Sequence, residues 1–146
     1  HVQGSSGTRA IGAEDFFVDL FTTALEPGEI ITRIEIPSAK DAKSSYLKLA
    51  HPASRYAVVG VGVMLNMDGD KVSSARVVVG GATPKATRCA GAEKALVGSM
   101  LDDAALNAAA SAIAADIGEN VMSDIYASGD YRKAVAGTYL KRAIKS

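Results

Sequence analysis

The sequence predicts an α+β fold, in which an antiparallel β-sheet packs against a C-terminal layer of about three helices. Two observations lead to this fold class. The middle of the chain alternates valine, leucine and isoleucine with small or polar residues at a period of two, which is typical of strands. The last third is rich in alanine and repeats its larger apolar residues every three or four positions, which is typical of helices. Because the strands precede the helices, the two kinds of element form separate layers.

The strands are expected in the first eighty residues, and glycine and proline mark their ends. The predicted ranges are Glu29–Ile36, Tyr46–Ala50, Val58–Met67 and Val72–Val79. In the first range every second residue is isoleucine or threonine, so one face is expected to be buried. Between the last two, Asp68-Gly-Asp70 predicts a tight hairpin turn in which glycine supplies a positive φ. In the returning strand we expect Ala75, Val77 and Val79 to point inward.

The helices are expected after residue 90. The predicted ranges are Ala92–Val97, residues 103–117 and Tyr131–Ile144. Gly98 is a C-terminal cap for the first helix, Asp102 or Asp103 begins the second, and Asp130 begins the third. The apolar stripes that should face the core are Leu106, Ala110, Ile113 and Ile117 in the second helix, and Ala136, Leu140 and Ala143 in the third.

The first forty residues are less regular. Val2–Gln3 and Thr8–Ile11 flank the turn Gly4–Gly7, a hairpin too short to be stable alone. The chain is therefore expected to begin inside a larger protein, although a processed or tagged terminus explains the same residues equally well. Three phenylalanines within Ala13–Phe21 are expected to form buried helical turns. The polar stretch Ser38–Lys43 predicts a linker, which divides the chain into domains 1–40 and 41–146.

Composition limits the possible partners and compartment. Of the 146 residues, 48% are hydrophobic and 22% charged, which is enough apolar material for a core. Lysine plus arginine equals aspartate plus glutamate at 16 each, so neither nucleic acid nor an anionic membrane is expected as the main partner. A single cysteine forms no internal disulfide, which suits a reducing cytoplasm. No apolar run is long enough for membrane insertion.

No catalytic constellation is visible among the side chains that carry chemistry. Cys89 follows Arg88, a neighbour able to lower a thiol pKa, yet it has no histidine or second cysteine beside it, which favours a buried thiol. His51 lies between a strand and a proline, which favours a structural role. Gly60 and Gly62 alternate with valines, which favours close backbone packing within a strand over a dinucleotide-binding turn. Gly80-Gly81 fits either a strand end or the close approach of a ligand or partner.

Lys48, Arg55 and Tyr56 place two cations and an aromatic ring at one edge of the predicted sheet. Such an edge can hold a flat, electron-accepting ligand. On residue types and spacing alone, a solvated lysine and a surface-loop tyrosine are the favoured interpretation. A further argument is needed to assign these residues a function.

A series of short segments supplies that argument. In order they are Asp15–Phe17, Leu25–Ile31, Ile34–Pro37, Tyr46–Lys48, Ser54–Ala57, Gly80-Gly81 and Asp130–Arg132. Together they resemble the FAD-binding medium (flavoprotein) subunit of the molybdenum hydroxylases, most closely the aerobic carbon monoxide dehydrogenase type. The resemblance covers nearly the whole chain. It implies an oxidoreductase subunit in which residues 1–40 end an FAD-binding subdomain and residues 41–146 form the carbon monoxide dehydrogenase flavoprotein C-terminal domain.

The resemblance also implies cofactors and partners. FAD would take electrons from 2Fe-2S clusters on an iron-sulfur small subunit, after substrate oxidation on a molybdopterin large subunit, and pass them to an external acceptor. The family's two glycine-rich FAD loops, Ala-Gly-Gly-x-Ser and Thr-Ile-Gly-Gly, do not occur in these 146 residues. We therefore expect half of a flavin site here, and no activity from this piece alone. The rival interpretation is a non-enzymatic binding or assembly module that retains the domain without flavin.

The family pattern assigns roles to three residues, Lys48, Tyr56 and Ile31, and Arg55 is a fourth candidate beside them. Lys48 matches a lysine that follows the domain boundary, and a lysine charge can stabilise negative charge on a flavin or its phosphates. Tyr56 matches a tyrosine that shields the flavin. Ile31 matches an aliphatic residue that contacts FAD, and Arg55 adds a charge or a partner contact. No catalytic residue and no metal ligand is expected in this chain.

Overall fold

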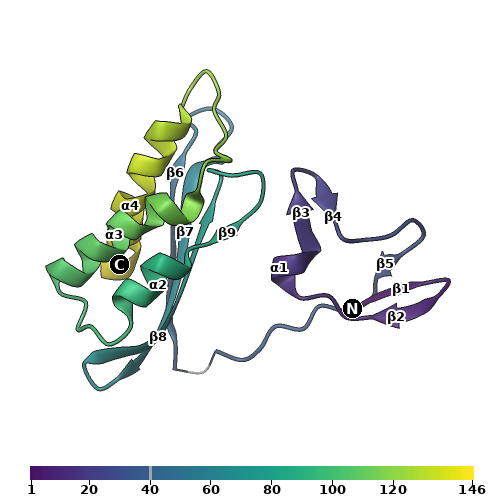
Figure 1. The fold of residues 1–146 in the computed structure, drawn as a ribbon, viewed down its shortest axis with the longest axis horizontal. Coiled ribbons are helices and arrows are strands. Elements are labelled where there is room, and N and C mark those ends of the chain that lie inside the picture. The colour runs from purple at the N-terminus through teal and green to yellow at the C-terminus, as the bar shows by residue number, and fades with distance from the viewer. Residues whose placement is uncertain (40) are drawn as a thin grey trace. The chain divides into compact units, whose positions relative to one another are not determined.

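The computed structural model of the protein describes residues 1–39 and 41–146, and it divides into two compact units, His1–Lys40 and Asp41–Ser146 (Figure 1). Lys40, which belongs to the predicted linker, lies outside the described residues. Each unit has its own strands and is considered separately. The second unit is an antiparallel sheet covered by C-terminal helices, as the sequence predicts.

Among the described residues, the sheet of the second unit has four strands in the order β6-β7-β8-β9, all antiparallel. Their bounds are β6 Lys43–Ala50, β7 Ala57–Asp68, β8 Lys71–Gly80 and β9 Thr87–Arg88. The predicted hairpin is confirmed: β7 ends at Asp68, β8 begins at Lys71, and Gly69 has φ +58°. The short strand β9 was not predicted from the sequence.

The alternation in β7 and β8 fills one side of the sheet with buried side chains. These include Val59, Val61, Val63 and Leu65 from β7, and Val72, Ala75, Val77 and Val79 from β8. They form one core cluster with apolar side chains of the helices. Each such side chain contributes roughly 1.5–3 kcal/mol when it is removed from water, so this cluster is the main source of stability in the unit.

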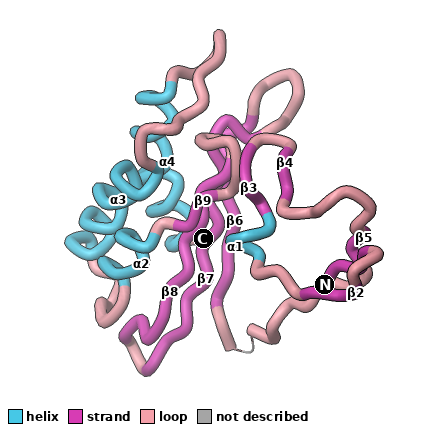
Figure 2. Tube along the Cα trace, turned by 45° about the vertical axis from the view of Figure 1, so that its right-hand side comes forward, coloured by secondary structure: helices cyan, strands magenta, loops and turns pink. Residues whose placement is uncertain are grey.

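The helices α2 Ala90–Leu96 and α4 Gly129–Lys145 pack on this side of the sheet, and α3 Asp103–Ile117 packs against both (Figure 2). Asp102 caps α3 by accepting a hydrogen bond from the Ala105 amide at 2.8 Å. Gly98 and Gly118, with φ +81° and +71°, follow the ends of α2 and α3 as predicted.

Two details of the helices differ from the sequence-based expectation. Ser128, not Asp130, begins α4, because its hydroxyl accepts the Tyr131 amide hydrogen bond at 3.2 Å. In α3 the fully buried alanine is Ala109 instead of Ala110. Ala109 and Ala110 are neighbours in α3, and the packing of α3 against α2 and α4 decides which of the two is buried.

Arg132 of α4 ties the helical layer to the end of the sheet. Its side chain is 5% exposed, and its guanidinium donates to the carbonyl oxygens of Val58 at 2.7 Å and Gly81 at 2.8 Å. Gly81 has φ +78°, and a Cβ at this position would lie 2.5 Å from the Ala57 carbonyl oxygen. The backbone that approaches Gly81 therefore belongs to this chain. Of the two interpretations of Gly80-Gly81, the structure agrees with a strand end, because β8 ends at Gly80.

The first unit contains two small sheets and one helical turn. Its elements are β1 Val2–Gly4, β2 Gly7–Arg9, α1 Ala13–Phe16, β3 Phe17–Asp19, β4 Thr22–Thr23 and β5 Ile30–Ile31. The predicted hairpin forms from β1 and β2, but it is not isolated, because β5 pairs with the other edge of β1. β3 pairs with β4 in the second small sheet.

Two expectations for the first unit are wrong. The predicted strand Glu29–Ile36 is reduced to Ile30–Ile31, because its partner β1 is only three residues long and pairs with those two residues. Its isoleucines are exposed, Ile34 at 76% and Ile36 at 86%. The phenylalanine-rich segment is likewise largely uncovered, with Phe21 fully exposed.

A bidentate ion pair organises the turn before β5. Arg9 donates to the two carboxylate oxygens of Glu29 at 2.8 and 2.7 Å, and Glu29 also accepts the Glu26 amide at 2.7 Å. These hydrogen bonds lower the pKa of Glu29 to about 2, because they stabilise its ionised form. The segment Glu26-Pro-Gly-Glu29 is therefore a turn held by its own carboxylate.

We predict that Gly81→Ala destabilises the second unit by about 1–3 kcal/mol, because alanine would have to adopt a strained positive φ and contact the Ala57 carbonyl. Gly80→Ala is the matched control, since no atom lies within 4 Å of a Cβ built there. Urea unfolding followed by far-UV circular dichroism measures both. Equal unfolding free energies for the two variants would contradict the role given to Gly81.

Candidate functional site

Among the described residues of the second unit, no helix packs on one face of its four-stranded sheet. The helices pack on the opposite face, where the buried valines lie (Figure 2). The side chains on the uncovered face follow from the strand register, because directly paired residues point to the same side. We call this surface the open face, and it consists of Ser44, Tyr46, Lys48, Gly60, Gly62, Met64, Arg76, Val78 and Gly80.

Few side chains project from the centre of the open face, because three of its residues are glycines. Lys48 pairs with Gly60, Gly60 with Gly80, and Tyr46 with Gly62. Glycine in a strand interior weakens it and commonly marks a place where another group comes close to the backbone. In this sheet three such positions adjoin one another across β7 and β8.

Tyr46 explains why one of these positions is glycine. A Cβ at Gly60 would lie 2.3 Å from the Tyr46 hydroxyl oxygen and 2.9 Å from its Cζ. The Tyr46 ring therefore extends across Gly60, while 59% of the residue remains exposed. Gly60 lies within a strand, β7, as predicted, and the group that needs the space beside it is the Tyr46 ring. Tyr46 itself was not singled out from the sequence, although its spacing of two from Lys48 places both on one face.

Lys48 lies at the end of the open face near the loop that joins β6 to β7. Its ammonium donates a hydrogen bond to the Arg55 carbonyl oxygen at 2.9 Å. The Lys48 residue is exposed, so the bond fixes the direction of the side chain and leaves most of its charge available. Arg55 has φ +63°, an unusual conformation for a residue with a side chain.

The loop between β6 and β7 is closed by main-chain hydrogen bonds. The His51 amide donates to the Tyr56 carbonyl at 2.8 Å, and the Arg55 amide donates to the His51 carbonyl at 2.9 Å. The Tyr56 residue is 81% exposed. The structure thus brings Lys48, near the end of β6, together with Arg55 and Tyr56 of the adjoining loop. Arg55 contributes its carbonyl group, which accepts the hydrogen bond from Lys48.

Ile31, the fourth predicted residue, belongs to the first unit. It is 47% exposed in β5 and lines a cavity of about 550 Å³ within that unit. Other residues along this cavity are Val2, Phe16 and Ile34. The cavity is lined mainly by apolar residues, and His1, Arg33 and Glu35 also border it.

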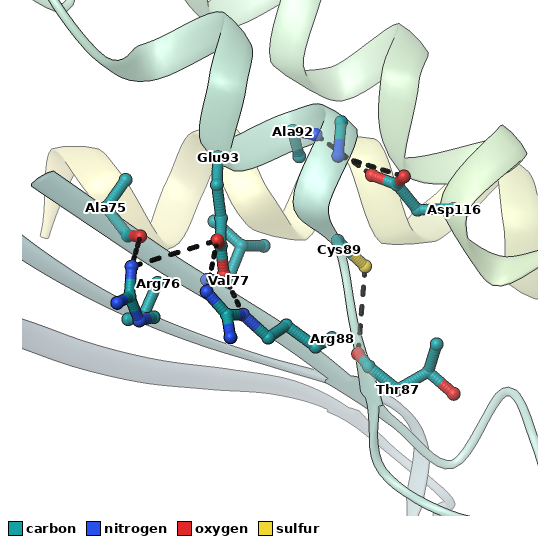
Figure 3. Close-up of polar contacts among 10 residues, drawn as sticks. Ala75, Arg76, Val77, Thr87, Arg88, Cys89, Ala92, Glu93 and Asp116 are labelled. Carbon is teal, nitrogen blue, oxygen red and sulfur yellow. Dashed lines mark hydrogen bonds and ion pairs between the residues drawn. The ribbon is translucent and has the colours of Figure 1, made fainter. Parts of the chain in front are cut away.

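The outer edge of the sheet is completed by a side chain of α2 (Figure 3). β9 pairs only with Val78 and Val79, and the next amide of β8, on Val77, donates to Glu93 at 3.0 Å. Arg88 donates to both oxygens of Glu93 at 2.9 Å. The Glu93 carboxylate therefore accepts the hydrogen bond that a carbonyl of a neighbouring strand would otherwise accept from the Val77 amide. The helical spacing of the sequence does not predict this contact.

Glu93 is 7% exposed, and its surroundings act on its pKa in opposite directions. Burial raises the pKa, whereas the bonds from Arg88 and the Val77 amide and the charges of Arg88 and Arg76 lower it. The lowering contributions are larger in sum, so the carboxylate stays ionised below its ordinary value of 4.5.

Cys89 is a buried thiol, as expected, and Arg88 does not activate it. The guanidinium of Arg88 is bound to Glu93, while the Cys89 sulfur lies 3.7 Å from the Thr87 carbonyl oxygen (Figure 3). Burial, together with the negative charges of Asp116 and Glu93, raises the pKa of Cys89 to about 12. Asp116 accepts hydrogen bonds from the Gly91 and Ala92 amides at the start of α2. These side chains hold elements together and carry no nucleophile.

Within residues 1–39 and 41–146, no cluster of three or more histidine, cysteine, aspartate or glutamate side chains has the arrangement of a metal site. The helices of the same residues are too short or too polar to cross a bilayer.

Comparison with known proteins gives the family. Residues 44–146 match the model of the CO dehydrogenase flavoprotein C-terminal domain. The chain is 31% identical to the glyceraldehyde dehydrogenase medium chain of Sulfolobus acidocaldarius and 35% identical to the nicotine 6-hydroxylase medium subunit of Paenarthrobacter nicotinovorans. These alignments cover 99% and 98% of the chain and 50% of each relative.

A solved structure agrees with both the sequence match and the fold. The carbon monoxide dehydrogenase of Hydrogenophaga pseudoflava superposes with a TM-score of 0.90 at 33% identity, over 99% of this chain and 50% of that one. The chain belongs to the CO dehydrogenase flavoprotein C-terminal domain family. It spans about half the length of the curated relatives it matches.

Membership of a flavoprotein family raises the question of whether the open face suits a flavin. An isoalloxazine ring is flat and apolar on its faces and carries polar atoms at its edge. Gly62 and Gly80 carry no side chain, the Tyr46 ring covers Gly60, and Tyr46 and Val78 add exposed apolar area. Lys48 supplies a directed positive charge at one end of that surface. The residues present are compatible with one wall of such a site.

We predict that Glu93→Gln lowers the unfolding free energy by about 1–3 kcal/mol near neutral pH, since it removes charge-assisted hydrogen bonds. The folded pKa of Glu93 is depressed, so its contribution is complete above its unfolded pKa and disappears as the pH falls through the folded value. The difference between the parent and the variant should therefore shrink below about pH 4.

Glu119→Gln is the matched control for this test, because Glu119 is 98% exposed and pairs only with Lys133 in the described structure. Urea unfolding over a series of pH values gives the free energies. A Glu93→Gln difference that is constant with pH would contradict the depressed pKa.

Proposed function

We propose that this chain is part of the flavoprotein subunit of a molybdenum-containing hydroxylase or dehydrogenase of the carbon monoxide dehydrogenase type. The family assignment and the medium-chain names of the relatives support this proposal. The observation that carries it furthest is the open face, which combines a glycine floor, the Tyr46 ring and the Lys48 ammonium on one uncovered surface.

In the proposed complex, bound FAD would supply electron transfer between 2Fe-2S clusters on the small subunit and an external acceptor. Substrate is oxidised on the molybdopterin large subunit, so residues of this chain do not contact it. The relatives named above bear the names of different substrates, glyceraldehyde and nicotine. This variety fits a flavoprotein part whose own chemistry is common to the group.

Lys48 is proposed to stabilise negative charge on the flavin or its phosphates. A positive charge near a redox group raises the group's affinity for electrons, and the effect falls with distance and with solvent screening. The bond to the Arg55 carbonyl holds the ammonium at a fixed place, so the charge acts on one part of the ligand.

Tyr56 is proposed to cover the flavin and restrict access to it. Its ring is 81% exposed in the loop that also anchors Lys48, so it is available to stack on a flat ligand. Arg55, whose carbonyl accepts the Lys48 bond, would present its side chain at the rim for a charge or partner contact. Ile31 would contribute an apolar contact from residues 1–40, which we assign to the end of the FAD-binding subdomain.

The test uses the full-length polypeptide that contains these 146 residues, purified with its natural partner subunits. We predict that Lys48→Met lowers the flavin midpoint potential by about 30 mV, which for a two-electron couple corresponds to about 1.4 kcal/mol. Tyr56→Ala should leave the charge in place and increase access of small oxidants to the reduced flavin. Spectroelectrochemical titration and stopped-flow reoxidation measure the two effects.

Lys71→Met and Tyr131→Ala are the controls, because Lys71 lies in the β7–β8 hairpin and Tyr131 on the surface of α4. An unchanged potential, flavin content and reoxidation rate in both test variants would remove Lys48 and Tyr56 from the flavin site. Absence of bound flavin from the full-length protein would favour the non-enzymatic module.

A further inference from the structure

The loop from His51 to Tyr56 carries the Tyr56 ring and the Arg55 carbonyl that holds the Lys48 ammonium, yet it has little packing to define its shape. Residues 52–56 are all exposed, and Arg55 has a positive φ that costs energy for a residue with a Cβ. An exposed loop in a strained conformation needs polar contacts that determine it.

The contacts converge on His51. Its main-chain N–H and C=O bond Tyr56 and Arg55, and its imidazole Nδ1 accepts hydrogen bonds from the amides of Ala53 and Ser54, both at 3.2 Å. A ring nitrogen that accepts two N–H groups must be unprotonated, so a neutral His51 carries its hydrogen on Nε2. The imidazole thus takes the part that an asparagine or aspartate side chain plays in an Asx-turn.

The other side of the imidazole is enclosed. Nε2 is buried and has no hydrogen-bond partner among the described residues, and the ring meets Tyr126 edge-to-face with 4.3 Å between centroids. Tyr126 lies in the segment between α3 and α4, and its amide bonds the Asp124 carboxylate at 2.8 Å. A buried polar atom without a hydrogen-bonding partner is costly, so a residue kept in this state needs a compensating role.

A short series of bonds connects the imidazole to the proposed site. Nδ1 accepts hydrogen bonds from Ala53 and Ser54 and so fixes the turn at these two residues. After this turn, the Arg55 amide donates to the His51 carbonyl. The Arg55 carbonyl then accepts the hydrogen bond from the Lys48 ammonium. The same closure bonds the carbonyl of Tyr56 to the His51 amide. Moving the imidazole would therefore move the acceptor of Lys48 and the backbone of Tyr56.

We propose that His51 is a positioning residue of the flavin wall: its unprotonated Nδ1 sets the loop that fixes the Lys48 ammonium and the Tyr56 ring, and Tyr126 holds the imidazole in place. The proposal rests on the proposed function of Lys48 and Tyr56. It adds His51 and Tyr126, neither of which touches the ligand, and it gives the histidine a role as a neutral acceptor without acid–base chemistry.

The experiment compares three substitutions at position 51 in the full-length protein with its partner subunits. Asparagine places a carbonyl oxygen where Nδ1 lies and should accept the same two amides, whereas glutamine is one methylene longer and alanine has no acceptor. We predict that His51→Asn keeps the flavin midpoint potential within about 10 mV of the parent, a third of the ~30 mV change expected for Lys48→Met. His51→Ala and His51→Gln should shift it in the same direction as Lys48→Met, by at least half as much.

The outcomes separate the two proposals. If Lys48→Met and Tyr56→Ala are silent, the proposed flavin wall is wrong and the positioning role falls with it. If they act while His51→Ala leaves the potential unchanged, only the role of His51 is overturned. If His51→Asn behaves like His51→Ala, the Nδ1 acceptor is not the cause, which also overturns the proposal.

A second measurement does not depend on flavin or on the folding of a variant. Long-range ¹H–¹⁵N correlation spectra of the parent chain report which imidazole nitrogen carries the hydrogen. We expect His51 to be the Nε2–H tautomer near neutral pH, with slowed hydrogen exchange at the Ala53 and Ser54 amides. The Nδ1–H tautomer, or free exchange at both amides, would overturn the proposal whatever the variants show.

Discussion

The buried guanidinium of Arg132 is the contact on which the arrangement of the second unit depends. It joins α4 to the carbonyls of Val58 and Gly81, at the start of β7 and just after β8, and to the Asp124 carboxylate at 2.5 Å. A buried charge is tolerated only when its hydrogen bonds are satisfied, and these partners satisfy it. Asp124 in turn holds the segment of Tyr126. The Arg132 side chain thereby holds both the end of the sheet and the segment of Tyr126, whose ring packs against His51.

The two faces of the sheet show how one alternating pattern serves two purposes. The valines of β7 and β8 build the core with the helices, while the positions between them hold glycine, methionine and arginine on the open face. Stability therefore resides on one side of the strands and the proposed binding surface on the other. A change on the open face can alter ligand contacts without creating a cavity in the core.

The sequence predicts the second unit well because its signals are local. Alternation gives β7 and β8, Asp102 and Gly118 delimit α3, and the spacing of Ala136 and Leu140 gives the buried side of α4. The failures concern partners distant in the chain. Ile34 and Ile36 alternate like a buried strand, but β1 pairs only with Ile30 and Ile31, so these two residues join no strand and stay exposed.

The candidate site divides in the same way. Lys48 and Tyr56 were found through family resemblance, and Tyr46 follows from a spacing of two once the strand is known. The role proposed for His51 has no sequence signature, because it depends on a ring nitrogen facing two amides and on Tyr126, far along the chain. Glu93 as a substitute for a strand is equally invisible, since its partner amide belongs to β8.

The Lys48 anchor has one further consequence. The acceptor of its ammonium is a main-chain carbonyl, which every amino acid offers, whereas the Arg55 side chain takes no part in that bond. The atom that holds the charge is thus independent of the residue type at position 55. Substitutions there that tolerate a positive φ can change the character of the rim while the ammonium stays where it is. The loop in this way allows the side chain at position 55 to change without moving the Lys48 ammonium.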